Sequence, residues 1–124
     1  MSRRTSLHHL DDMIAACERA RRHFGGVTLD ELQADEMRSD AVVRTLEIVG
    51  EACKRLDQPT KDRFPSIQWR AIAGMRDRLI HRYDQVDWVL VFDTLTSYLP
   101  PTLIELRAIR TILESEETPR TEES

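Results

Sequence analysis

The feature of this sequence that most constrains its fold is the spacing of its apolar residues. In several separate segments, apolar side chains recur every three or four positions, which places them along one face of a helix. We find no sustained alternation of apolar and polar residues, no internal repeat and no glycine-rich phosphate loop. The pattern therefore predicts an all-α protein, built as an antiparallel bundle of four to five helices with short connections.

The first half of the chain carries clear signals for where helices begin and end. An apolar stripe over residues 7–24 predicts a first helix, which Gly25 ends. Thr28 and Glu31 have the spacing of a capping box, which predicts that a short helix begins there. A longer helix is predicted over residues 35–56, and its wide apolar stripe predicts packing against two neighbours.

Two prolines interrupt the chain after this second long helix. Pro59 and Pro65 are expected to bound an irregular connector. Ser66 is placed to cap a third helix, whose apolar periodicity extends from Trp69 to Ile80. This third helix contains most of the residues that are candidates for chemistry.

The last part of the chain predicts two more helical segments and a tail. Asp87 is placed to cap a helix whose periodicity extends to Tyr98, and the prolines at 100–101 must kink or restart the chain. A final helix is predicted over residues 103–113. Residues 115–124 are acidic and polar without apolar anchors, which predicts a disordered tail.

Length and composition set limits on the kind of protein. The chain has 124 residues, of which 40% are hydrophobic, and this suits one compact domain over residues 1–114. The sequence shows no apolar run long enough for a membrane span and no secretion signal, so we expect a cytoplasmic protein. Cys17 and Cys53 lie in apolar helical patterns and are expected to be reduced core residues, and no metal site or cofactor is implied.

Charge is distributed unevenly along the chain. Six basic and two acidic residues lie between Lys61 and Tyr83, a local balance of +4 in a chain of net charge −4, so the remainder carries −8. The overall charge argues against a protein that coats nucleic acid indiscriminately. Because most of the basic residues are arginines, whose planar donor fork matches phosphate oxygens, the segment indicates a partner that carries phosphate.

Within this segment, four polar residues are spaced as a candidate active site. On an ideal helix Arg76 and Tyr83 lie almost on the same line, while Asp77 and His81 are one turn apart. Asp77 is placed to orient the imidazole of His81 for proton transfer, and Arg76 is placed to stabilise charge on a phosphate. Since roughly 140° separates Arg76 from His81 on one such helix, a cleft shared by two protomers would bring both onto one phosphate more easily.

Arginine, histidine and a carboxylate are sufficient for one reaction of RNA. They can promote attack of a 2′-hydroxyl on its own phosphate, with histidine moving a proton and arginine stabilising the developing charge. DNA lacks that internal nucleophile. The residue types leave a plain structural alternative open, in which Asp77 and His81 form a solvated pair and Tyr83 packs at a helix end.

The spacing Arg-x(4)-His-x-Tyr, formed by Arg76, His81 and Tyr83, is similar to a known family motif. Two flanking stretches, Leu46–Ala52 and Ile67–Gly74, resemble the second-helix signature and the motif lead-in of the same family. Taken together, they make the sequence resemble the HepT-like toxins of the HEPN superfamily of helical ribonucleases. The resemblance extends over about residues 7–113.

This resemblance implies a HEPN-like bundle that acts as a toxin in a type VII toxin-antitoxin system. It implies a metal-independent endoribonuclease, working as a homodimer on tRNA or mRNA, with Arg76 and His81 as catalytic residues. Asp77 and Glu51 are expected to support the site. For the RNA contacts we expect the nearby arginines, which are Arg70, Arg78 and Arg82.

The resemblance also implies a partner and a means of control. Toxins of this type are neutralised by a minimal nucleotidyltransferase antitoxin that transfers AMP to the motif tyrosine, here Tyr83. Added phosphate would place negative charge and bulk where RNA must bind. Two other hypotheses stay open: a noncatalytic helical module that binds a nucleotide or a nucleotidyltransferase, and a purely structural helical adaptor.

Overall fold

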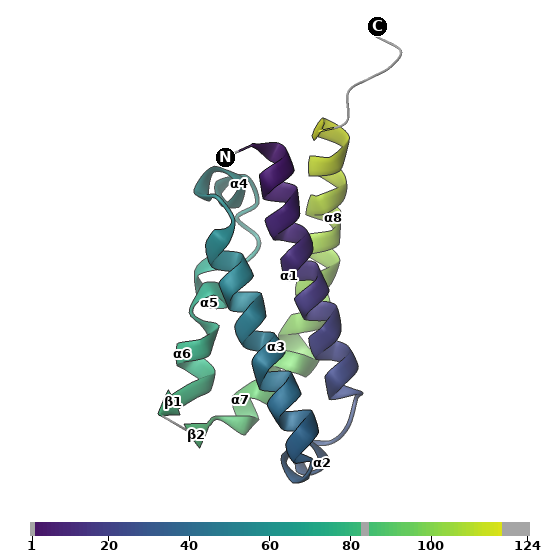
Figure 1. Cartoon of the computed structure of the whole chain (residues 1–124), viewed down its shortest axis with the longest axis vertical. Coiled ribbons are helices and arrows are strands. Elements are labelled where there is room, and N and C mark those ends of the chain that lie inside the picture. The colour runs from purple at the N-terminus through teal and green to yellow at the C-terminus, as the bar shows by residue number, and fades with distance from the viewer. Residues whose placement is uncertain (1, 83–84, 118–124) are drawn as a thin grey trace, which may run out of the picture.

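The computed structural model describes residues 2–82 and 85–117, and these form a bundle of helices around one apolar core (Figure 1). Three long helices, α1 (Arg3–Phe24), α3 (Glu36–Arg55) and α8 (Leu99–Glu117), make up most of it. The shorter elements are α2 (Leu29–Ala34), α4 (Gln58–Arg63), α5 (Trp69–Ala73), α6 (Met75–Leu79), β1 (Ile80–Arg82), β2 (Gln85–Val86), α7 (Trp88–Asp93) and the π-helical turn η1 (Thr94–Tyr98). The predicted all-α, HEPN-like helical bundle is confirmed.

The core lies where α1 packs against both α3 and α8. Leucines from all three helices are completely buried there, among them Leu10, Leu46 and Leu103. Burying one such side chain contributes about 1.5–3 kcal/mol, so this contact is the main source of stability in the bundle. Among the described residues, every helix is too short or too polar to cross a lipid bilayer.

Local signals end α1 and start the next two helices as predicted. Gly25 ends α1 in the left-handed conformation at φ 65°, a backbone angle that disfavours other residues. Thr28 and Glu31 form the reciprocal capping box at the start of α2. Asp35 then caps α3 by accepting a hydrogen bond from the backbone N–H of Arg38.

The segment between Pro59 and Pro65 was expected to be irregular, and this was wrong. Pro59 lies in the first turn of α4, where proline costs no hydrogen bond. Asp57 caps this helix and also accepts a hydrogen bond of 2.6 Å from Ser6 of α1. Burial acts to raise the pKa of Asp57, but hydrogen bonds from Ser6 and Thr60 hold that pKa below its ordinary value. A charged Asp57 therefore fastens α4 to α1.

Ser66 does not cap the third helix, contrary to expectation. Its hydroxyl donates to Glu105 of α8 at 2.8 Å, and α5 begins only at Trp69, with Gln68 as an N-cap that makes no side-chain bond. Trp69 is 8% exposed, and its indole N–H donates to the backbone oxygens of Lys61 and Phe64. The indole thus fixes the end of α4 against the start of α5.

The predicted third helix is broken twice, and the expectation that the chain has no strands was wrong. Gly74 separates α5 from α6, and α6 ends at Leu79. Ile80 then adopts an extended conformation and pairs with Val86 in a two-stranded antiparallel sheet formed by β1 and β2. The backbone oxygen of Leu79 accepts from the N–H of Asp87 at 2.8 Å, which takes the place of the next helical hydrogen bond.

Asp87 caps α7 as predicted, accepting a hydrogen bond from the N–H of Leu90. The interruption predicted at the prolines appears as a change of helix type, because η1 widens to π-helical geometry just before they enter the first turn of α8. Tyr98 was expected to follow the buried periodicity but is 59% exposed. The extra residue in the π-helical turn shifts the register of the following side chains.

The predicted boundary of the tail was wrong by three residues. Helix α8 continues through residues 115–117, and Glu116 forms a two-pronged ion pair with Arg63 of α4 at 2.8 and 3.0 Å. Arg3 of α1 also contacts Glu116. These contacts supply the anchor that apolar residues do not provide there. The rest of the predicted tail, residues 118–124, lies outside the described residues.

Candidate active site

The candidate site is built on α6, a helix of five residues. Met75 and Leu79 are buried and hold this helix to the core one turn apart. The three charged residues between them, Arg76, Asp77 and Arg78, are therefore exposed. The short helix presents two arginines and one carboxylate to solvent.

Arg76 is oriented by an acidic residue of another helix. Its Nε lies 3.3 Å from Oε2 of Glu47 on α3, and its side chain is 65% exposed whereas that of Glu47 is 22% exposed. The partly buried carboxylate holds one edge of the guanidinium. The remaining N–H donors of Arg76 stay accessible to a phosphate, because Arg presents five donors in a fixed plane.

Glu47 was missed by the sequence reasoning, which selected Glu51 instead. Glu51 is one turn further along α3, where it pairs with Lys54 at 3.5 Å and lines a pocket of about 370 Å³ between α1 and α3. The structure thus assigns the acidic partner of Arg76 to Glu47. Both glutamates belong to the Leu46–Ala52 stretch, so the signal lay in the right segment at the wrong position.

The helical geometry predicted for the motif was wrong, because α6 ends before His81. The backbone of His81 belongs to β1, so the ideal-helix relations of Asp77 with His81 and of Arg76 with Tyr83 do not apply. The 140° separation of Arg76 and His81 fails for the same reason. The side chain of His81 and all of Tyr83 lie outside the described part of the chain.

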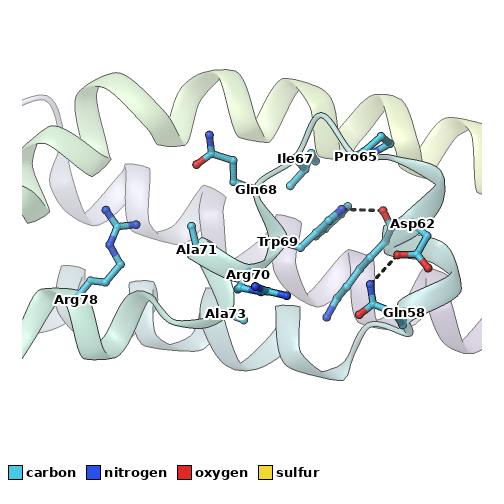
Figure 2. A pocket seen from close by; sticks show the side chains of 11 residues that line it. Gln58, Asp62, Pro65, Ile67, Gln68, Trp69, Arg70, Ala71, Ala73 and Arg78 are labelled. Carbon is cyan, nitrogen blue, oxygen red and sulfur yellow. Dashed lines mark hydrogen bonds between the residues drawn. The ribbon is translucent and has the colours of Figure 1, made fainter.

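The other predicted arginines lie on both sides of this point. Arg70 on α5 and Arg78 on α6 are exposed and line one pocket of about 930 Å³, together with Lys61 of α4 (Figure 2). Arg82 lies in β1, and its side chain is outside the described residues. The structure therefore brings Arg70 and Arg78 to a common pocket and places Arg76 on the same short helix as Arg78.

The two cysteines are buried and free, so the predicted core positions are confirmed. Burial raises the pKa of the Cys17 thiol to about 12, which keeps it protonated and unreactive near neutral pH. Cys53 donates a hydrogen bond to the backbone oxygen of Trp69, and burial raises its pKa as well. Both thiols belong to the core and not to the candidate site.

The comparisons with known proteins agree with this arrangement. The family profile described as "Ribonuclease HepT-like" matches residues 13–109, which include α6 and its partner Glu47. The chain belongs to the HepT-like ribonuclease family. The match covers all helices that position the motif.

Several curated proteins are similar to this family member over most of its length. A protein named "Putative RNase" from Caldanaerobacter subterraneus is 32% identical over 97 residues, which cover 78% of this chain and 87% of that protein. "Probable ribonuclease HepT" from Thermococcus cleftensis is 34% identical over 98 residues, or 79% of this chain and 89% of that protein. A third, a "Putative RNase" from Methanocaldococcus jannaschii, is 32% identical over 91 residues, or 73% and 75%. No solved structure matches the chain.

Proposed function

We propose that this HepT-like protein is a metal-independent endoribonuclease that cleaves tRNA or mRNA in the cytoplasm, as the toxin of a type VII toxin-antitoxin system. The observation that supports it most is Arg76, exposed on α6, oriented by Glu47 and followed directly by the strand that contains His81. Membership of a ribonuclease family supports the same reaction class. In this proposal Arg76 and His81 are the catalytic residues.

The proposed reaction is an internal transesterification of RNA. The 2′-oxygen attacks the adjacent phosphorus, the bond to the 5′-oxygen breaks, and the products are a 2′,3′-cyclic phosphate and a 5′-hydroxyl. His81 transfers a proton between the oxygens, and Arg76 stabilises the charge that builds on the non-bridging oxygens. Asp77, in the first turn of α6, supports the site from the position next to Arg76.

The proposed protein acts as a homodimer. The segment from Lys61 to Tyr83 carries a charge of +4, and two such segments beside each other would attract an RNA strand more strongly than one. Arg70, Arg78 and Arg82 are the proposed contacts to the phosphates that flank the cleaved bond. Arg70 and Arg78 are exposed, as this role requires.

Control is proposed to act at Tyr83. A nucleotidyltransferase antitoxin would use the phenolic oxygen of Tyr83 to attack the α-phosphorus of ATP, which forms a phosphodiester to AMP, releases pyrophosphate and gives the phenolic proton to a base or to water. Tyr83 directly follows Arg82 in the basic segment. One or more added phosphates would compete with RNA for the neighbouring arginines.

The first test is cleavage of purified tRNA and a model mRNA in EDTA. We expect fragments that end in a cyclic phosphate from the unmodified protein, and none from Arg76→Ala or His81→Ala. His8→Ala is the matched control, because it removes an exposed histidine of α1 and should leave cleavage unchanged. Intact-mass measurement first establishes that Tyr83 carries no AMP.

The same assay tests the proposed control. Incubation with the antitoxin and ATP should add the mass of AMP and abolish cleavage, whereas Tyr83→Phe should stay unmodified and resist this inactivation. If unmodified protein cuts neither RNA, the nuclease proposal fails. The noncatalytic module, which binds a nucleotide or the nucleotidyltransferase, then becomes the better explanation.

A further inference from the structure

A large pocket lies beside the candidate site without a part in the proposed reaction. It has a volume of about 930 Å³, within the usual range for a small-molecule site, and lies between α4, the start of α5 and α6. Figure 2 shows Arg78 at one end, Gln58 and Asp62 at the other, and Arg70 between them. Its walls thus come from elements that the motif and the connector share.

The charges that line the pocket are mainly positive. Lys61, Arg70 and Arg78 supply three cations, and Asp62 is the acidic residue among the described lining. Asp62 is engaged, because it accepts a hydrogen bond of 2.7 Å from the side-chain amide of Gln58. Within the described part of the chain, no carboxylate forms an ion pair with Arg70 or Arg78, so their donors are available to an anion.

The pocket is held in shape before any ligand binds. The indole of Trp69 donates to backbone oxygens at the end of α4, and Asp57 fastens the start of α4 to Ser6 of α1. Because these bonds fix α4 relative to α5, Lys61 and Arg70 are positioned without an ordering cost at binding. The lining also offers apolar surface, from Ile67 and its neighbours, of the kind that contacts a ribose or a base.

We propose that this pocket is a nucleotide subsite for the RNA substrate, which holds a nucleotide next to the cleaved bond by its phosphate. The proposal rests on the proposed function, and it adds Lys61 and a defined pocket to the RNA contacts. Arg78, which lines the pocket, is two residues from Arg76 on α6. One RNA strand can therefore contact both sites. Three cations around one pocket match one or two phosphates of that strand.

The test measures RNA binding without cleavage. His81→Ala protein is titrated with a fluorescent single-stranded RNA of about ten nucleotides, and the titration is repeated at several salt concentrations. Adding Lys61→Ala and Arg70→Ala should weaken binding about tenfold at low salt and reduce the slope of log K against log salt by about 1. Arg22→Ala, at the opposite end of α1 from α4, is the charge-matched control and should change neither quantity.

Two further measurements separate the alternatives. Thermal unfolding confirms that the exposed substitutions leave the protein folded. Equilibrium dialysis with AMP and ATP tests whether the pocket takes a free nucleotide instead. If the pocket variants lose binding of AMP or ATP but bind RNA as the parent does, the RNA subsite is overturned. Unchanged RNA affinity and salt slope, within about twofold of the parent, would also overturn it.

The outcome is distinct from that of the proposed nuclease. RNA binding that needs Lys61 and Arg70 would stand even if no RNA were cut. Conversely, RNA cleavage by the unmodified protein together with unchanged RNA binding by the pocket variants would remove the subsite and leave the nuclease intact.

Discussion

At the scale of single residues, the contact between Arg76 and Glu47 joins two helices that are far apart in the sequence. An arginine of 65% exposure would otherwise sample many rotamers, and the carboxylate at 3.3 Å restricts them. Since a surface ion pair contributes little to stability, about 0–1 kcal/mol, the contact matters more for the placement of the guanidinium than for folding. Glu47 is therefore a positioning residue for the catalytic arginine.

We predict that Glu47→Ala lowers kcat for RNA cleavage about tenfold with little change in KM, because the guanidinium is then aligned in only a fraction of encounters. Glu51→Ala is the matched control one turn along α3, and it should leave kcat unchanged. Initial rates over a range of RNA concentrations separate the two parameters. Equal losses in both variants, or a loss confined to Glu51→Ala, would contradict the assignment.

Sequence reasoning found the catalytic candidates but not this partner. The Arg-x(4)-His-x-Tyr spacing is a local pattern, so Arg76, His81 and Tyr83 can be picked from the sequence alone. The choice between Glu47 and Glu51 depends on how α3 is rotated against α6. That rotation is set by long-range packing, which no local spacing encodes.

At the scale of elements, the close approach of α3 and α5 determines where the third helix breaks. Gly50 of α3 faces the backbone of α5, and a Cβ atom built on it would lie 3.1 Å from the backbone oxygen of Ile72 and 3.6 Å from that of Ala73. The next residue, Gly74, ends α5. The absence of a side chain at Gly50 thus lets α5 lie directly on α3, and α6 leaves at a different angle.

Gly50→Ala should destabilise the protein by about 1–3 kcal/mol, because the new methyl group has rigid backbone in front of it. Helix propensity alone predicts the opposite, a gain of roughly 0.5–1 kcal/mol for Gly to Ala inside a helix. The sign of the change in the urea midpoint of unfolding therefore decides between the two effects. A more stable variant would show that α5 can move away from α3 at little cost.

The elements that could be predicted are those with local signals. The ends of α1, α2 and α7 follow from Gly25, Thr28 and Asp87, which act on backbone groups within a few residues. The break at Gly74 could not be predicted, since the apolar periodicity continues across it. The β1–β2 pair depends on Ile80 meeting Val86, and that pairing competes with a helix only in the folded context.

At the scale of the whole molecule, the bundle places α6 and the β1–β2 pair at its surface, so Arg76 is open to a second copy of the chain (Figure 1). The sequence was sufficient to predict the all-α class, because burial of one face per helix is a local property. It was not sufficient to predict the relation of Arg76 to His81. A site shared between protomers is the arrangement that the proposed homodimer makes testable.

We predict that Arg76→Ala and His81→Ala protomers complement each other when they are co-expressed with different tags and purified as a heterodimer. If one protomer supplies the arginine and the other the histidine, one of the two sites in the heterodimer retains both residues, and about half of the parent activity returns. Light scattering checks that the species has twice the mass of one chain. No activity in a confirmed heterodimer would mean that each protomer uses its own pair.

The contacts of Glu116 with Arg3 and Arg63 bring the beginning of α1 and the end of α8 to the same pole of the bundle as α4. The β1–β2 pair lies toward the opposite pole. A reporter protein or an affinity handle attached beyond either end of the described helices would accordingly leave from one pole. For protein engineering, this means that both attachment points are distant from the motif, and that circular permutation needs only a short peptide to join them.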